Sequence, residues 1–197
     1  TDIRMQRMDG LELLGHLKKR DVDSPTVVLI TAYSDIQPAV SYHRGAEAIF
    51  TKPFTLKGLV ERVEWLLTPR RERWSRDADA PPWRRLLANA RDIVDGKNNR
   101  IVEVGRGGLC LSSGEPDLNE GESVDIQVTW QGGPLRKLNG AGVVRWKVQD
   151  KVAGETESFI YGIEFTRIAD DSIDELLQWL EDNRPTPYIP CFADISM

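Results

Sequence analysis

Apolar residues in the first third of the chain switch between helical spacing and short continuous runs. Leu11, Leu14 and Leu17 follow one another at the spacing that places them on one face of a helix. The run Thr26–Thr31 is continuous and rich in β-branched residues, which is typical of a parallel strand covered on both faces. A helix, a strand and a helix are then expected at residues 36–44, 48–51 and 59–67. This alternation predicts an α/β fold.

From about residue 120 onward the pattern changes to a period of two. Apolar and polar side chains alternate over residues 124–130, 144–148 and 159–165, which predicts half-buried antiparallel strands. A helix is expected after them, begun by a capping box of Ser172 and Glu175. Several short strands and one helix predict a small β-barrel. The expected turns lie at Gly107-Gly108, Gly132-Gly133 and Asn139-Gly140.

The segment between the two patterns is rich in proline and arginine. Residues 69–82 contain three prolines, many charges and few apolar side chains, which is typical of a solvated connector. The expected organisation is an α/β domain at 1–67, a linker at 68–82, a β-barrel domain at 83–184 and a C-terminal tail at 185–197.

Charge is distributed unevenly along the chain. The 197 residues carry 26 basic and 31 acidic side chains, for a net charge of −5, but residues 69–85 carry a net +3 and residues 86–197 a net −8. The overall negative charge disfavours nucleic acid as a partner, while the short cationic segment suits a compact anionic ligand. No apolar run approaches the roughly 20 residues that cross a bilayer, so no membrane partner is expected.

Residue types narrow the chemistry further. The two cysteines, Cys110 and Cys191, are too few for a disulfide scaffold, which predicts a cytoplasmic location. The sequence contains no recognisable Ser-His-Asp set, metal-ligand cluster or phosphate-binding P-loop, so we expect no enzymatic activity.

Three short motifs follow one another within the first 54 residues. They are Asp2–Gly10 (DIRMQRMDG), Leu29–Ala32 (LITA) and Ala48–Phe54 (AIFTKPF). This series resembles the receiver domains of two-component response regulators, which have a flavodoxin-like α/β fold. The resemblance implies that Asp2 accepts a phosphoryl group from a sensor histidine kinase, that Lys52 pairs with the phosphoryl oxygens and that Thr31 hydrogen-bonds one of them. From residue types alone, a Lys–Asp ion pair without phosphoryl chemistry is the simpler interpretation.

The receiver resemblance is incomplete. The family's proline is Gln6 here, its switch aromatic is Ile49, and its first strand, acidic pair and first two helices have no counterpart. Asp2 is then the one remaining ligand for Mg²⁺, which the resemblance implies only if the acidic pair is present. A homodimer, in which a second copy completes the sheet, stays open.

We therefore predict that residues 1–67 alone do not accept a phosphoryl group. The reason is that Mg²⁺, which neutralises phosphoryl charge, would lack most of its ligands. Incubating the chain with Mg²⁺ and a small phosphodonor should leave Asp2 unmodified by mass spectrometry, and a stable aspartyl phosphate at Asp2 would contradict the prediction.

A second set of motifs lies in the last two thirds of the chain. Glu103–Leu111 (EVGRGGLCL) is followed by Val144–Trp146 (VRW), Tyr161–Phe165 (YGIEF) and a terminal helix. Over roughly residues 70–183 this series resembles PilZ domains, which are six-stranded barrels that bind cyclic di-GMP. The resemblance implies a cyclic di-GMP site made by an arginine motif and a D/N-x-S-x-x-G turn.

The implied nucleotide site departs from the family pattern. No two arginines of the linker are four apart, Glu103 replaces the acid or amide, Gly105 replaces the serine, and Gly108 alone is unchanged. Each lost charge-assisted hydrogen bond costs about 1.5–3 kcal/mol, so several departures together weaken binding by orders of magnitude. The candidate cyclic di-GMP residues are Arg70, Arg71, Arg73, Arg76, Glu103, Gly105 and Gly108.

Two functions stay open at this point. One is a receiver–PilZ regulator that responds to cyclic di-GMP and to a phosphorelay. The other is an adaptor whose degenerate PilZ barrel docks a protein target without nucleotide. In the second case we expect docking at exposed Trp74, Trp83 and Trp130 and at the acidic barrel surface.

Overall fold

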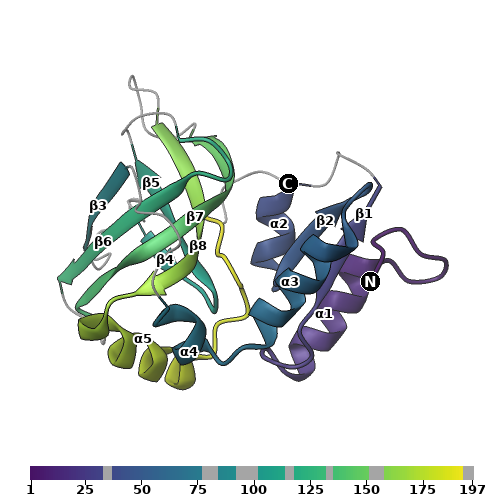
Figure 1. The fold of residues 1–197 in the computed structure, drawn as a ribbon, viewed down its shortest axis with the longest axis horizontal. Coiled ribbons are helices and arrows are strands. Elements are labelled where there is room, and N and C mark those ends of the chain that lie inside the picture. Colours follow the sequence, from purple (N-terminus) through teal and green to yellow (C-terminus); the bar gives the residue numbers. More distant parts are fainter. Residues whose placement is uncertain are drawn as a thin grey trace.

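An α/β part and a curled β-sheet lie side by side, and the C-terminal segment runs between them (Figure 1). The computed structural model describes residues 1–32, 37–76, 84–91, 102–113, 118–131, 135–150 and 158–192. The α/β part contains α1 (Gly10–Arg20), β1 (Val28–Thr31), α2 (Pro38–His43), β2 (Ala48–Thr51) and α3 (Leu56–Leu67). The remaining elements are α4 (Arg70–Trp74), β3 (Arg84–Arg91), β4 (Val102–Val104), β5 (Gly108–Ser113), β6 (Ser123–Gln131), β7 (Lys137–Asp150), β8 (Ser158–Ile168) and α5 (Asp170–Asn183).

The α/β part is built on a short parallel sheet. Strands β1 and β2 pair in parallel, with Val28 opposite Ala48, and Asp2 forms a parallel bridge on the other side of β1. Helix α1 begins at a capping box, in which the N–H of Glu12 donates to the Asp9 carboxylate at 2.7 Å and the N–H of Asp9 donates to Glu12 at 3.2 Å. The predicted order of helices and strands is confirmed in this part.

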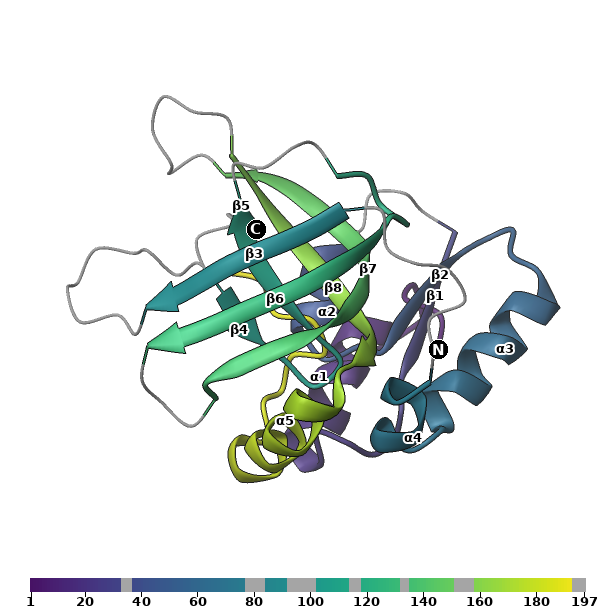
Figure 2. The ribbon, with the colours of Figure 1, turned by 60° about the vertical axis from the view of Figure 1, so that its left-hand side comes forward.

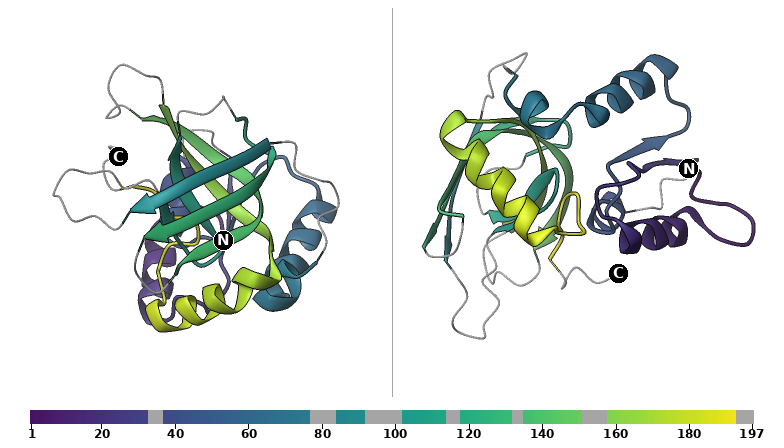
Figure 3. Two further views of the ribbon diagram at one scale, coloured as in Figure 1. Left: turned by 90° about the vertical axis from the view of Figure 1, so that its left-hand side faces the viewer. Right: turned by 90° about the horizontal axis from the view of Figure 1, so that it is seen from below.

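The second sheet has the strand order β3-β6-β7-β8-β5-β4. Strand β3 pairs with β6 in parallel and the other neighbours are antiparallel. The sheet is strongly curled (Figure 2), and α5 lies across one end of it (Figure 3). The six predicted strands and the C-terminal helix are thereby confirmed.

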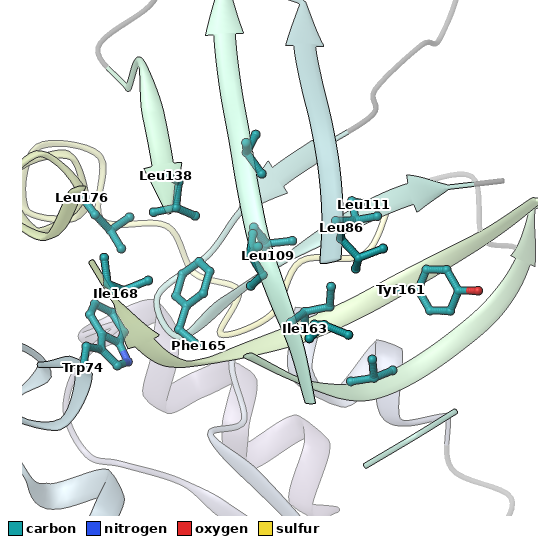
Figure 4. Packing of buried hydrophobic residues seen from close by; sticks show 14 of the residues in the cluster. Trp74, Leu86, Leu109, Leu111, Leu138, Tyr161, Ile163, Phe165, Ile168 and Leu176 are labelled. Atoms are coloured by element: carbon teal, nitrogen blue, oxygen red, sulfur yellow. The ribbon is translucent and has the colours of Figure 1, made fainter. Parts of the chain in front are cut away.

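The inner face of the curled sheet holds the larger hydrophobic core. Phe165, Ile168 and Leu176 meet there with residues of the central strands (Figure 4). Leu109, Ile163 and Phe165 are 0% exposed, so the curled sheet and the helices packed on it exclude water from the centre.

The turn expected at Asn139-Gly140 and the capping box expected at Ser172 and Glu175 do not form. Asn139-Gly140 lies inside β7, opposite Gln127 and Ile126 of β6, so it is not a turn. Helix α5 begins two residues before Ser172, and the Ser172 hydroxyl accepts a hydrogen bond from the N–H of Asn139 at 3.1 Å. These polar groups attach α5 to β7 instead of capping the helix. The expected turn at Gly132-Gly133 lies outside the described residues.

The linker prediction is wrong for its first residues. Residues 70–74 form helix α4, and Trp74, which is 0% exposed, belongs to the core of the curled sheet. Its ring meets Phe165 edge-on, with 5.6 Å between the ring centres, as Figure 4 shows. The buried ring of Trp74 attaches this charged segment to the core of the curled sheet, because a Trp side chain buries a large apolar area. The other predicted domain boundaries stay predictions.

Candidate functional site

Three predicted receiver residues lie at the same edge of the parallel sheet. The Lys52 ammonium group donates to the Asp2 carboxylate at 2.6 Å, and both side chains are nearly half exposed. Thr31, the last residue of β1, is buried, and its carbonyl accepts from the N–H of Lys52 at 2.7 Å. The carboxyl ends of parallel strands meet at one edge, so the fold brings these residues together. Their roles in phosphoryl chemistry stay predictions.

The electrostatics of this edge favour an ionised acid. The hydrogen bond from Lys52, followed by the charge of the same side chain, holds the pKa of Asp2 below its ordinary value. In the part of the chain that the structure describes, no three His, Cys, Asp or Glu side chains gather as a metal site requires. Asp2 alone therefore does not fit a Mg²⁺ site.

The four arginines predicted to grip cyclic di-GMP have partners within the chain. Arg70 pairs with Asp23 of the α/β part, and Arg71 pairs with Asp174 of α5. Arg76 pairs with Glu72 one helical turn away, at 2.6 Å. The arginines therefore serve contacts within the fold in this structure.

Arg73 is the most deeply placed of these arginines, at 4% exposure. Its guanidinium donates to the carbonyl of Leu66 at 2.9 Å and lies 4.6 Å from the centre of the Trp65 ring. Burial lowers the pKa of Arg73, and the Nε atom has no hydrogen-bond partner. Arg73 thus ties α3 and α4 together beneath the surface.

The predicted nucleotide turn connects β4 to β5. Glu103 is half-buried on β4, and the N–H of Gly105 donates to the carbonyl of Gly108 at 2.8 Å. A Cβ atom at Gly108 would lie 2.1 Å from the carbonyl oxygen of Ile163. The one residue that keeps the family pattern is therefore required for close packing of β5 on β8.

Arg106, within the same turn, was not among the predicted site residues. It is 2% exposed, and its guanidinium donates to the Glu47 carboxylate at 2.8 Å and to the carbonyl of Gly45 at 2.9 Å. Lys18 of α1 donates to the same carboxylate at 2.6 Å. Burial lowers the pKa of Lys18, although the charge of Glu47 opposes this shift. An arginine of the turn therefore points into the α/β part.

A second buried acid, Glu164 of β8, joins the two parts. It is 0% exposed and pairs with Arg62 of α3 and, at 2.7 Å, with Arg145 of β7. The Tyr188 hydroxyl also donates to it at 2.7 Å. Burial by itself would raise the pKa of Glu164, but the two arginine charges and the hydrogen bonds outweigh burial, so the pKa is lowered.

Sequence reasoning missed Glu164 because one face of β8 was read as exposed. The outer face of this sheet is buried as well, since Cys110, Trp146 and Ile160 are at most 6% exposed. The pairing of β7 with β8 shifts register between Val144 and Trp146, a bulge that places Trp146 on the outer side. Part of this signal was present in the sequence, because the outward residues Cys110, Trp146 and Ile160 are apolar.

Two of the three tryptophans predicted as docking residues lie within the described part of the chain. Trp74 is buried and that prediction is wrong. Trp130 is half-buried against the core. Trp83 lies outside the described residues.

The fold and these sites define a class of protein. An Asp–Lys pair lies at the edge of a parallel sheet, and buried ion pairs join this α/β part to a curled sheet with a terminal helix, which defines a protein of two connected parts. No helix among the described residues has the length and apolar character to cross a bilayer.

Comparison with known proteins identifies the family. Residues 1–64 match the response regulator receiver domain, and residues 86–182 match the PilZ domain. The chain belongs to the receiver–PilZ signal-transduction regulators, and both resemblances seen in the sequence are confirmed.

Several curated bacterial regulators share part of the sequence. The chain is 43% identical over 72 residues to the C4-dicarboxylate transport transcriptional regulatory protein DctD of Pseudomonas aeruginosa, covering 36% of this chain and 15% of that protein. It is 46% identical over 65 residues to the DNA-binding transcriptional regulator NtrC of Escherichia coli, covering 32% and 14%. It is 37% identical over 117 residues to the transcriptional regulatory protein TrcR of Mycobacterium tuberculosis, covering 59% and 43%. The chain thus spans less than half the length of these relatives.

Proposed function

We propose that this regulator is an adaptor whose PilZ domain acts through protein contacts and does not take up cyclic di-GMP at the turn of residues 103–108. The observation that carries the proposal is that the hydrogen-bond donors of this turn already have partners within the chain. The N–H groups of Arg106 and Gly107 donate to the carbonyls of Pro187 and Tyr188, each at 2.9 Å, and the Arg106 side chain is bound to Glu47. The donors that an anionic ligand would need are already used.

The arginines on α4 support the same interpretation. A ligand phosphate would have to take Arg70 from Asp23 and Arg71 from Asp174, or reach the buried Arg73. These pairs are partly or largely exposed, so each pair exchanged in this way offsets about 0–1 kcal/mol of the new contact. The existing partners therefore reduce the net affinity for the nucleotide, in addition to the engaged donors of the turn.

The receiver part supplies the input in this proposal. The Asp2–Lys52 pair at 2.6 Å and the nearby Thr31 have the residue types that receive and hold a phosphoryl group. We take a sensor histidine kinase as the partner that the receiver domain implies. The output is contact with a protein target, for which the net charge of −8 over residues 86–197 favours a basic surface.

A cyclic di-GMP effector is the second candidate. It is favoured by Arg71 and Arg76, whose side chains are 59% and 56% exposed and so remain within reach of a ligand. In that case the nucleotide would bind at Arg71 of α4 and at Arg76, just after the end of that helix, without contacts to the turn.

Isothermal titration distinguishes the two candidates. The folded chain should give no saturable heat with cyclic di-GMP up to about 1 mM, because its donors are engaged. Saturable binding that is lost in Arg76→Ala would contradict the adaptor proposal. Lys57→Ala is the matched control, since Lys57 and Glu61 form an exposed pair with the same helical spacing, and it should bind as the parent does.

A further inference from the structure

The segment Thr186–Phe192, called the strap here, lies across the turn of residues 105–108. Its carbonyl groups accept hydrogen bonds from the N–H groups of Arg106 and Gly107, and the Arg106 side chain donates to the carbonyl of Thr186 at 3.2 Å. In Figure 1 the strap is the yellow segment that passes between the curled sheet and the α/β part.

The turn has glycines where the strap passes closest. A Cβ atom at Gly107 would lie 2.0 Å from the ring of Tyr188. A Cβ atom at Gly105 would lie 2.7 Å from the carbonyl oxygen of Tyr188 and 2.8 Å from that of Pro187. Any side chain at either position would collide with the strap. Gly105, which departs from the serine of the family pattern, is thus the residue that the strap requires.

Helix α2 of the receiver part holds the other side of the strap. The N–H of Tyr188 donates to the carbonyl of Tyr42 at 3.0 Å, and the N–H of Cys191 donates to Nδ1 of His43 at 3.0 Å. The rings of Tyr42 and Tyr188 stack with 6.3 Å between their centres. The same few residues therefore contact the last turn of α2 and the nucleotide turn of the PilZ part.

The middle of the strap is buried in the interior of the protein. Tyr188 is 1% exposed and Ile189 0% exposed. They pack with Cys110 and Trp146 of the curled sheet and with Leu66 of α3. The Tyr188 hydroxyl donates a hydrogen bond to the Glu164 carboxylate at 2.7 Å. This segment therefore replaces solvent between the two parts with a continuous apolar and hydrogen-bonded contact.

We propose that the strap is the resident occupant of the PilZ signature turn and that it couples the position of α2 to the conformation of that turn. The inference rests on the proposed function, because it takes the turn as a protein-contact site. A displacement of α2 would move the strap through the hydrogen bonds that the N–H groups of residues 188 and 191 donate to α2. It would thereby change the hydrogen bonds between the strap and the N–H groups of Arg106 and Gly107. The strap is thus a mechanical connection between the receiver part and the PilZ part.

Hydrogen exchange of individual amides in the full chain tests the coupling. His43→Ala removes the acceptor on α2, and exchange at Arg106 and Gly107 should become roughly twofold to tenfold faster. His16→Ala is the matched control, since both histidines are exposed and His16 lies on α1, away from the strap contacts given above. Amides of β6 and β7 should keep their rates in both variants. Faster exchange at Cys191 alone, with Arg106 and Gly107 unchanged, would overturn the coupling.

A double-mutant cycle tests the occupancy of the turn. Gly107→Ala should strongly destabilise the parent, because the new methyl group meets the Tyr188 ring. In a Tyr188→Ala background the same change should shift the unfolding midpoint far less. Equal effects in both backgrounds would show that the ring does not occupy this position. Cyclic di-GMP binding to the parent would contradict the proposed function, whereas these two readouts address the strap itself, so the two failures can be told apart.

Discussion

Glu164→Gln should lower the free energy of unfolding by about 3–5 kcal/mol, because it removes one partner of a buried ion-pair cluster. The amide keeps the shape of the acid but cannot neutralise Arg62 and Arg145, whose side chains are 15% and 33% exposed. It also replaces a charged acceptor of the Tyr188 hydroxyl with a neutral one. Urea denaturation followed by circular dichroism measures the change.

Glu61→Gln is the control for this substitution. Glu61 pairs with Lys57 at 3.7 Å on the exposed side of α3, and an exposed pair contributes only about 0–1 kcal/mol. If Glu164→Gln were as mild as the control, the cluster around Glu164 would not hold the two parts of the protein together.

The same acid predicts a loss of stability at low pH. The pKa of Glu164 is lower in the folded protein than its ordinary value of 4.5, so the folded state binds this proton less readily than the unfolded state. The stabilisation is therefore complete above the ordinary value and is lost as the pH falls through the folded pKa. Between about pH 6 and about pH 3 the parent should lose more stability than Glu164→Gln. The other acids are present in both proteins, so their contribution to the loss of stability cancels when the parent and the variant are compared.

Trp74→Ala should cost about 3–5 kcal/mol, as expected for removing a fully buried aromatic side chain. Trp74 is 0% exposed and meets Phe165 edge-on in the core of the curled sheet, so its loss leaves a large cavity. Thermal and urea unfolding, followed by circular dichroism, measure the effect. Trp74→Phe keeps part of the apolar volume and should lose about half as much.

Trp130→Ala provides the comparison for Trp74. Trp130 is half-buried at the margin of the same core, so less apolar area is exposed by its removal. Equal and small effects at both positions would restore the interpretation of residues 70–74 as a solvated linker.

Short apolar patterns in the sequence predicted the type and place of several helices and strands, although the capping box of Ser172 and Glu175 and the turn at Asn139-Gly140 were predicted wrongly. The run at 26–31 and the motif at 48–54 predicted β1 and β2, because a short continuous apolar run with β-branched residues is typical of a covered strand. The spacing of Leu59, Val63 and Leu66 likewise predicted α3. The strand at residues 144–148 was placed correctly, but Val144 and Trp146 were predicted on one face and lie on opposite faces of the sheet. The reason is a bulge that changes the register of β7 between these two residues.

The candidate cyclic di-GMP site illustrates the limit of motif reasoning. Its residues were identified by type and spacing, and all seven lie within the described part of the chain. The pair of Arg76 with Glu72 is local, four positions apart, but Asp23 and Asp174 were not predictable as partners, because they lie 47 and 103 positions from Arg70 and Arg71. A motif specifies which groups could meet a ligand, but the packing decides whether those groups are already engaged.

The sequence by itself determined that this protein joins a receiver segment to a PilZ domain, since periodicity, turn residues and short motifs act over a few positions. Only the tertiary structure decided how the two parts are joined. Arg62 meets Glu164 across 102 positions of the chain, and Arg106 meets Glu47 across 59. No local pattern encodes such pairs, because they form only when burial makes an unpaired charge costly and folding brings a partner within reach.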